Sequence, residues 1–154
     1  MTWSIIARDA VTQRTGIIVA TKFFAVGAVV PHIKTGVGAI ASQAFINPYF
    51  AAQGLELLAA GATGEAVIAK LVAADQGRAN RQLHLIDSRG SFAAYTGAAC
   101  IDWCGHEVRT GYSVAGNMLA GPAVLKETSN GYEANAQLPF ARRLIAAKIG
   151  RAHV

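Results

Sequence analysis

The chain opens, after its initiator methionine, with Thr2-Trp3-Ser4-Ile5-Ile6-Ala7-Arg8, and a second apolar stretch follows at Gly16-Ile17-Ile18-Val19-Ala20-Thr21-Lys22. Both stretches are rich in β-branched and apolar residues, which favour strands. The segment 9–15 between them is polar enough to turn. The two stretches therefore predict a β-hairpin, which starts at the first residues of the chain.

The hairpin also predicts which side chains share a face. Alternate residues of a strand point the same way. One face then carries Thr2, Ser4, Ile6 and Arg8. If Thr2 pairs near Lys22, Asp9 pairs near Thr15 and the loop covers residues 10–14.

Thr2 is a candidate nucleophile because removal of Met1 would leave it at the amino terminus. A threonine hydroxyl is a poor nucleophile alone. A free α-amine, with a reference pKa of about 7.7 to 8.0, can act as its base. Methionine aminopeptidases clip Met before small residues, so Thr2 needs no dedicated propeptide. The alternative is that position 2 is small only because termini tolerate many residues.

Length and composition indicate one folded domain. The chain has 154 residues, of which 53% are hydrophobic and 15% charged. A chain of this length buries a substantial core, and this composition argues against disorder. Its apolar stretches are shorter than about 18 residues, and no leader opens the chain, so we expect no membrane span and a cytoplasmic protein.

The charge pattern does not favour nucleic acid as a partner. The formal net charge is +5, but the basic residues are scattered and Arg142-Arg143 is the only adjacent pair. A phosphate-binding surface usually clusters its basic residues. Cys100, Cys104 and His106 offer three zinc ligands, a set that only His32 or His84 could complete, and two reduced thiols are the simpler interpretation. We expect no metal and no cofactor.

The middle of the chain predicts further strands and two consecutive helices. The apolar stretch 23–30 ends at Pro31, and residues 36–43 resume as a strand. Asn47-Pro48 begins a helix that stops at Gly61. Thr63 caps a second helix that ends at about Asp75. The two helices are expected to cover one face of a sheet.

The second half predicts another hairpin and two more helices. Strands at 83–86 and 92–96 flank the turn 87–90, and residues 111–116 form a further strand. Helices follow at about 121–131 and 138–147. This order is the α+β pattern of sheets between helical layers.

The last six residues, 149–154, correspond to one reading frame of a common sequencing adapter. We therefore expect the domain to span residues 2–148 and to lack its natural carboxyl terminus. The alternative is a coincidence of six residues.

The sequence resembles the DUF1028 family, whose function is uncharacterised. The likeness covers about residues 2–148. Five segments carry it: Ser4-Ile5-Ile6-Ala7-Arg8-Asp9, Phe23-Phe24-Ala25-Val26-Gly27-Ala28-Val29-Val30-Pro31, Gly36-Val37-Gly38-Ala39-Ile40-Ala41-Ser42-Gln43-Ala44, Asp102-Trp103-Cys104-Gly105-His106 and Gly116-Asn117-Met118-Leu119-Ala120-Gly121-Pro122. The resemblance implies a fold of the N-terminal-nucleophile hydrolases, an αββα sandwich of two antiparallel sheets between helical layers.

Within that class the opening hairpin resembles a proteasome β-subunit, which implies that Thr2 occupies the nucleophile position. Lys22 falls where the returning strand presents an active-site residue, although the proteasome pattern has an acid there. A lysine would lower the pKa of the amine or hydroxyl, or would orient a substrate carboxylate. Lys22 can equally be a solvated lysine at a strand end.

Asn117 is a candidate to hold the oxyanion, either through its side-chain amide or through a nearby backbone N–H. A turn position is the plainer role for an asparagine beside glycine. Ser42 and Gln43 lie at a strand end and are candidate substrate-binding residues. Asp102 and His106 are candidates for an acid/base pair, and a serine nucleophile made of Ser42 and His106 is a further alternative.

These residues together predict an amidohydrolase that cleaves a small amide or peptide through an acyl-enzyme on Thr2. The alternative is a protein that uses the same fold for small-molecule binding or self-assembly, because a fold does not entail an activity. The pair Phe23-Phe24 is expected to belong to the core, and an interface of a homo-oligomer is the alternative.

Overall fold

The computed structural model of the protein describes residues 1–149. Two antiparallel sheets of four strands each make up its centre. In spatial order, the first sheet contains β2 (Thr15–Thr21), β1 (Thr2–Arg8), β8 (Tyr112–Leu119) and β7 (Trp103–Arg109). The second sheet contains β3 (Pro31–Lys34), β4 (Gly38–Ala44), β5 (Arg81–Asp87) and β6 (Phe92–Thr96).

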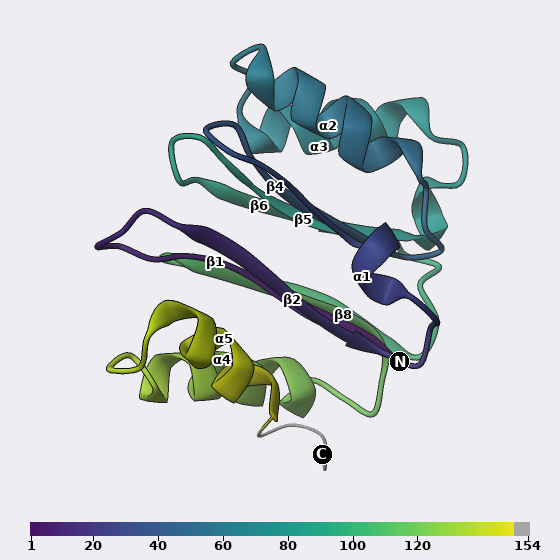
Figure 1. The fold of residues 1–154 in the computed structure, drawn as a ribbon. Helices are drawn as coiled ribbons and strands as arrows, with labels where there is room; N and C mark the ends of the chain where they lie inside the picture. Colours follow the sequence, from purple (N-terminus) through teal and green to yellow (C-terminus); the bar gives the residue numbers. More distant parts are fainter. Residues whose placement is uncertain (150–154) are drawn as a thin grey trace.

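The helices lie outside the two sheets, which face each other (Figure 1). On one side α2 (Tyr49–Ala59) and α3 (Gly64–Ala74) cover the second sheet. On the other side α4 (Ala123–Ala134) and α5 (Phe140–Ile149) cover the first sheet. The short helix α1 (Val26–Val29) connects the two sheets, and a turn of 3₁₀ helix spans Arg78–Asn80. The expected α+β order, with helices outside two antiparallel sheets, is confirmed.

Local sequence explains where the elements begin and why they pack closely. The Thr63 hydroxyl accepts a hydrogen bond from the Ala66 N–H at 3.2 Å, so it caps α3 as predicted. Gly54 lets α2 approach β4, because a Cβ there would lie 2.4 Å from the Ile40 Cδ1. No helix within residues 1–149 is long and apolar enough to cross a bilayer.

Three apolar clusters occupy the three interfaces between layers. One lies between α4/α5 and the first sheet, and a second lies between α2/α3 and the second sheet. The third lies between the sheets and includes Ile6, Ala39 and Ile86. It fills only part of that space; buried polar side chains such as Gln82 and His84 occupy another part, next to the candidate site.

The opening hairpin forms, with its register offset by one residue from the prediction. Thr2 pairs with Thr21 and Arg8 pairs with Thr15, so β2 ends just before Lys22. The hairpin loop is therefore residues 9–14 rather than 10–14.

The sequence analysis missed α1, β3 and β7, which are the least regular elements. The strand β3 has four residues and begins at Pro31, at a sheet edge where a missing N–H is tolerated. The strand β7 is also an edge strand, lacks a continuous apolar alternation and has an irregular register between Trp103 and Gly105. The interpretation of residues 149–154 as adapter-derived falls, beyond position 149, outside the described residues.

Candidate functional site

A cavity of about 760 Å³ opens at the end of the two sheets where β1 begins and where β2, β4 and β8 end. Its polar lining residues include Thr2, Thr21, Lys22, Gln43, Asn80 and Asn117. Its apolar lining residues include Phe23, Val26, Phe45, Ile46, Ile101 and Met118. Lys22 is the charged side chain of this lining within the described part of the chain. The cavity therefore suits a partly apolar ligand.

Thr2 lies at the centre of the strand ends that form the cavity. It pairs with Thr21 on one side and with Asn117 on the other, so the three side chains share one face. The Thr2 Oγ1 lies 2.9 Å from the Thr21 Oγ1, which also accepts the Phe23 backbone N–H at 3.2 Å. Met1 precedes Thr2 in this chain and lines the cavity, so the Thr2 nitrogen belongs to a peptide bond in this structure.

Gln82, on β5, connects the two amide side chains of the cavity wall. The Gln82 Oε1 accepts a hydrogen bond from the Gln43 Nε2 and another from the Asn117 Nδ2, each at 2.9 Å. All three side chains are at least 97% buried. The amides of β4 and β8 are thus held together across the space between the sheets.

A chain of hydrogen bonds continues from Gln43 through Ser4 and His84 to Ser113, near the start of β8. The Ser4 hydroxyl donates to the Gln43 Oε1 at 2.7 Å, so its oxygen accepts the N–H of the His84 Nε2 at 2.8 Å. The His84 Nδ1 is left to accept from the Ser113 hydroxyl at 2.7 Å. This assigns His84 as the neutral Nε2–H tautomer.

Burial explains why His84 is neutral. Its side chain is fully enclosed. Desolvation, with a smaller contribution from His106, lowers the pKa of His84 to about 3. His84 is therefore uncharged near neutral pH and acts here as a structural hydrogen-bonding group.

Four of the predicted site residues lie together. Thr2, Lys22, Gln43 and Asn117 all line the cavity. Lys22 is exposed at its rim, one residue beyond the end of β2. Their proposed roles in substrate binding and catalysis stay predictions.

The other three predicted residues lie away from the cavity lining. Ser42 is buried on the opposite face of β4 from Gln43, and its Oγ has no hydrogen-bond partner within residues 1–149. Asp102 is exposed in a left-handed conformation, with φ of 55°. The His106 Nδ1 pairs with the Thr96 Oγ1 at 2.9 Å. The hydrogen bonds of this structure join His106 neither to Asp102 nor to Ser42.

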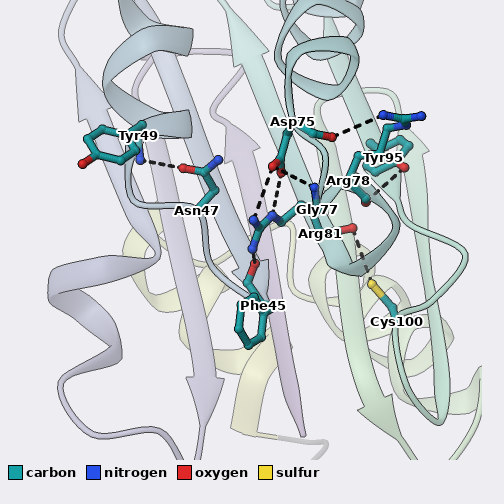
Figure 2. A network of polar contacts seen from close by, with 9 residues as sticks. All are labelled: Phe45, Asn47, Tyr49, Asp75, Gly77, Arg78, Arg81, Tyr95 and Cys100. Carbon is teal, nitrogen blue, oxygen red and sulfur yellow. Dashed lines mark hydrogen bonds and ion pairs between the residues drawn. The ribbon is translucent and has the colours of Figure 1, made fainter.

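An ion pair lies beside Phe45, one of the cavity-lining residues, and Figure 2 shows the polar contacts around it. The Arg81 Nε contacts the Asp75 Oδ2 at 2.6 Å, and the Arg81 Nη1 donates to the Phe45 carbonyl oxygen at 2.6 Å. The Arg81 guanidinium also lies 5.4 Å from the centre of the Phe45 ring. The hydrogen bond from Arg81 lowers the pKa of Asp75. The end of α3 thus holds Phe45 at the cavity.

The two cysteines are free thiols near this wall. The Cys100 Sγ lies 3.4 Å from the Arg81 carbonyl oxygen, and burial raises the pKa of Cys100. Within residues 1–149, no group of three His, Cys, Asp or Glu side chains is arranged to hold a metal ion.

The sequence analysis missed Gln82, Thr21 and the Ser4–His84–Ser113 chain. One signal was present in β5, where Gln82 and His84 alternate with Leu83 and Leu85. Polar residues at every second position of a buried strand mark a polar face. Their partners on β1 and β8 are distant in sequence, so the contacts themselves had no local signal.

Together, the fold and the site define a mixed α+β protein of two stacked antiparallel sheets, with a cavity at the amino terminus of β1. The chain belongs to the DUF1028 family, a family of unknown function, which it matches over residues 2–152.

A crystal structure of a DUF1028 protein from Silicibacter pomeroyi is similar to this chain at a TM-score of 0.93 and 34% sequence identity. The similarity covers 97% of this chain and 69% of the Silicibacter pomeroyi protein. A search of curated proteins gave no significant match.

Proposed function

We propose that this protein is an N-terminal-nucleophile amidohydrolase that acts through Thr2 once Met1 has been removed. The observation that carries the proposal is the position of Thr2, which begins β1 and lines a cavity of about 760 Å³ between two sheets. A nucleophile whose own amine is the base needs only to be the first residue and to reach substrate. The layered arrangement of helices and sheets agrees with such a hydrolase fold.

In the proposed reaction the Thr2 Oγ1 attacks the carbonyl carbon of an amide. The α-amine of Thr2 takes the hydroxyl proton and then passes it to the leaving amine as the C–N bond breaks. The acyl group remains on Thr2 as an ester, and water hydrolyses this ester to a carboxylic acid. Over the two steps one water molecule is consumed, and the amine and the carboxylic acid are released.

The oxyanion that forms during attack needs an N–H donor. The amino group of Asn117 already faces Gln82, so a backbone N–H at the cavity is the better candidate for this role. Lys22 at the rim provides a positive charge that would attract or orient a substrate carboxylate. The substrate class is a small amide or peptide with an apolar part.

The test begins with the intact mass of the purified protein, which should show loss of Met1. A β-lactone or another acylating probe should then add to the Thr2 hydroxyl, and peptide mapping should locate the adduct. Thr2→Ala should abolish the adduct and reduce any amide hydrolysis at least about 1000-fold, whereas Thr2→Ser should retain both. Thr15→Ala, at the opposite end of β2, is the matched control and should label normally.

A second function, binding without catalysis, is favoured by the exposed apolar residues around the cavity. Phe23 is 61% exposed, Phe45 is 73% exposed and Ile101 is 61% exposed. Such a patch is typical of a surface that binds a ligand or a second copy of the chain. Retention of Met1 on the mature protein would overturn the hydrolase proposal and support this second function.

A further inference from the structure

The orientation of the Gln82 amide is fixed by its surroundings. The Gln82 Nε2 lies 2.8 Å from the Gly116 carbonyl oxygen and 3.0 Å from the Gly105 carbonyl oxygen. It also lies 2.9 Å from the Thr96 Oγ1. Backbone carbonyl oxygens accept hydrogen bonds and cannot donate them. The amino group of Gln82 must therefore face these two carbonyls, and the Gln82 Oε1 must face the opposite way.

This orientation determines that of Asn117. The Gln82 Oε1 can only accept, so the group of Asn117 that lies 2.9 Å from it is the amino group. The Asn117 Oδ1 consequently points away from Gln82. Gln43 is held in the same manner, since its Nε2 faces Gln82 and its Oε1 accepts from Ser4.

The Asn117 Oδ1 borders the cavity. Asn117 is among the cavity-lining residues, and within residues 1–149 no hydrogen bond to its Oδ1 is present. The fully enclosed side-chain atoms without a partner in this part of the chain are the Trp3 Nε1, the Arg8 Nε and the Ser42 Oγ. The Asn117 oxygen is not one of them, so it is reached from the cavity. The cavity wall therefore presents the Asn117 Oδ1 as a hydrogen-bond acceptor that has no partner among the described residues.

We propose that Gln82 is a positioning residue that fixes the Asn117 Oδ1 toward the cavity, where it accepts a hydrogen bond from the N–H of a bound amide. The acceptor sits beside the nucleophile, because Asn117 and Thr2 are direct partners of adjacent strands, whose spacing is about 4.8 Å. The ligand class is thus a primary or secondary amide. An ester or a tertiary amide of the same shape brings no N–H and leaves the Asn117 oxygen unpaired.

The inference rests on the proposed function only in taking this N–H to be that of the scissile amide. Its test measures binding and is carried out on the full chain with Thr2→Ala, which removes turnover. The probes are N-methylbenzamide, N,N-dimethylbenzamide and methyl benzoate, which share an apolar ring and differ in the N–H. Binding is followed by chemical-shift titration in ¹⁵N-labelled protein.

We expect N-methylbenzamide to bind about tenfold more tightly than the other two probes. Asn117→Leu should bring the three affinities within about twofold of one another, since it removes the acceptor but keeps an apolar side chain of similar size. Gln82→Met should do the same by releasing the Asn117 amide. Thr96→Val should keep the tenfold preference, because the two carbonyls still satisfy both hydrogens of the Gln82 amino group.

Equal binding of the three probes to the Thr2→Ala protein would overturn the proposal, and so would a preference that survives Asn117→Leu. Nuclear Overhauser contacts provide a second readout that needs no core variant. They should place the Asn117 amino protons beside Gln82, and finding these protons beside the bound probe instead would also overturn it. If N-methylbenzamide binds preferentially but the unsubstituted protein forms no adduct on Thr2, the hydrolase proposal fails and the proposed role of Gln82 and Asn117 in amide binding still holds.

Discussion

The two faces of β5 contact their neighbours in different ways, one mainly by apolar packing and the other largely by hydrogen bonds. Leu83 and Leu85 face α2 and α3 in an apolar cluster, whereas Gln82 and His84 face the other sheet and are held by hydrogen bonds to β1 and β8. All four side chains are fully buried. At these four positions, one strand therefore combines apolar side chains that pack without directional contacts with polar side chains that are held by hydrogen bonds.

The leucine side chains of β5 contribute mainly to stability, whereas its polar side chains set the orientation of neighbouring amide groups. Apolar burial is non-directional and scales with area, so the leucine face holds α2 and α3 without specifying any single atom. A buried polar group must instead find a partner of the right kind, because an unpaired one is costly. The Gln82 face therefore specifies which atoms Gln43 and Asn117 present to the cavity.

The largest expected change in stability comes from the apolar face. Leu85→Ala should lower the free energy of unfolding by about 2 to 5 kcal/mol, since it removes a fully buried side chain and leaves a cavity. Urea denaturation measures this loss. The probe preference of the cavity should be unchanged under conditions where the variant is folded. If Leu85→Ala instead kept near-normal stability and changed the probe preference, the two faces of β5 would not have the separate roles described here.

A pH dependence is the next largest effect, and it belongs to the polar face. The pKa of His84 is about 3 in the folded protein and near its ordinary 6.5 when unfolded, so the unfolded state binds the proton more readily. Its contribution to stability is fully present above pH 6.5. It should fall by about 1.4 kcal/mol per pH unit as the pH drops from 6.5 toward 3.

His84→Gln tests this assignment, because a glutamine can donate to Ser4 and accept from Ser113 without titrating. The variant should show a flatter dependence of unfolding free energy on pH between 6.5 and 4.5. Partial burial also lowers the pKa of His106, which acts in the same direction, so His106→Gln is the parallel control. An unchanged slope in His84→Gln would show that His84 is protonated in the folded protein.

The contrast between the faces also explains what could be predicted from the sequence. Helix caps such as Thr63 and the opening hairpin depend on neighbouring residues, and these predictions are confirmed. The Gln82 contacts depend on β8, whose Gly116 and Asn117 are more than thirty residues away. Such contacts follow from the packing of the sheets and have no short-range pattern.

The suggested pairing of Asp102 and His106 rests on a spacing of four residues, which does not by itself bring two side chains together. Four residues apart on a helix, two side chains are neighbours. Here His106 lies on the strand β7 and Asp102 just before it, where four residues span about 13 Å. The pair therefore does not form, and His106 contacts Thr96 of the other sheet. Lys22 lies one residue beyond Thr21, the partner of Thr2, because the observed hairpin register differs from the predicted one by one residue.

The smallest expected change in unfolding free energy comes from Thr96, which contacts Gln82 on the polar face of β5. Thr96→Val should lower the free energy of unfolding by only about 0.5 to 1.5 kcal/mol. The Gln82 amino group has two hydrogens but three acceptors within 3.0 Å, so Gln82 can lose the Thr96 hydroxyl, and the cost comes mainly from the lost hydrogen bond between Thr96 and His106. Thermal or urea unfolding, compared with the isosteric change Thr15→Val at a half-buried position of β2, measures the difference. A loss as large as that of Leu85→Ala would mean that the hydroxyl, and not the two carbonyls, holds the Gln82 amide in place.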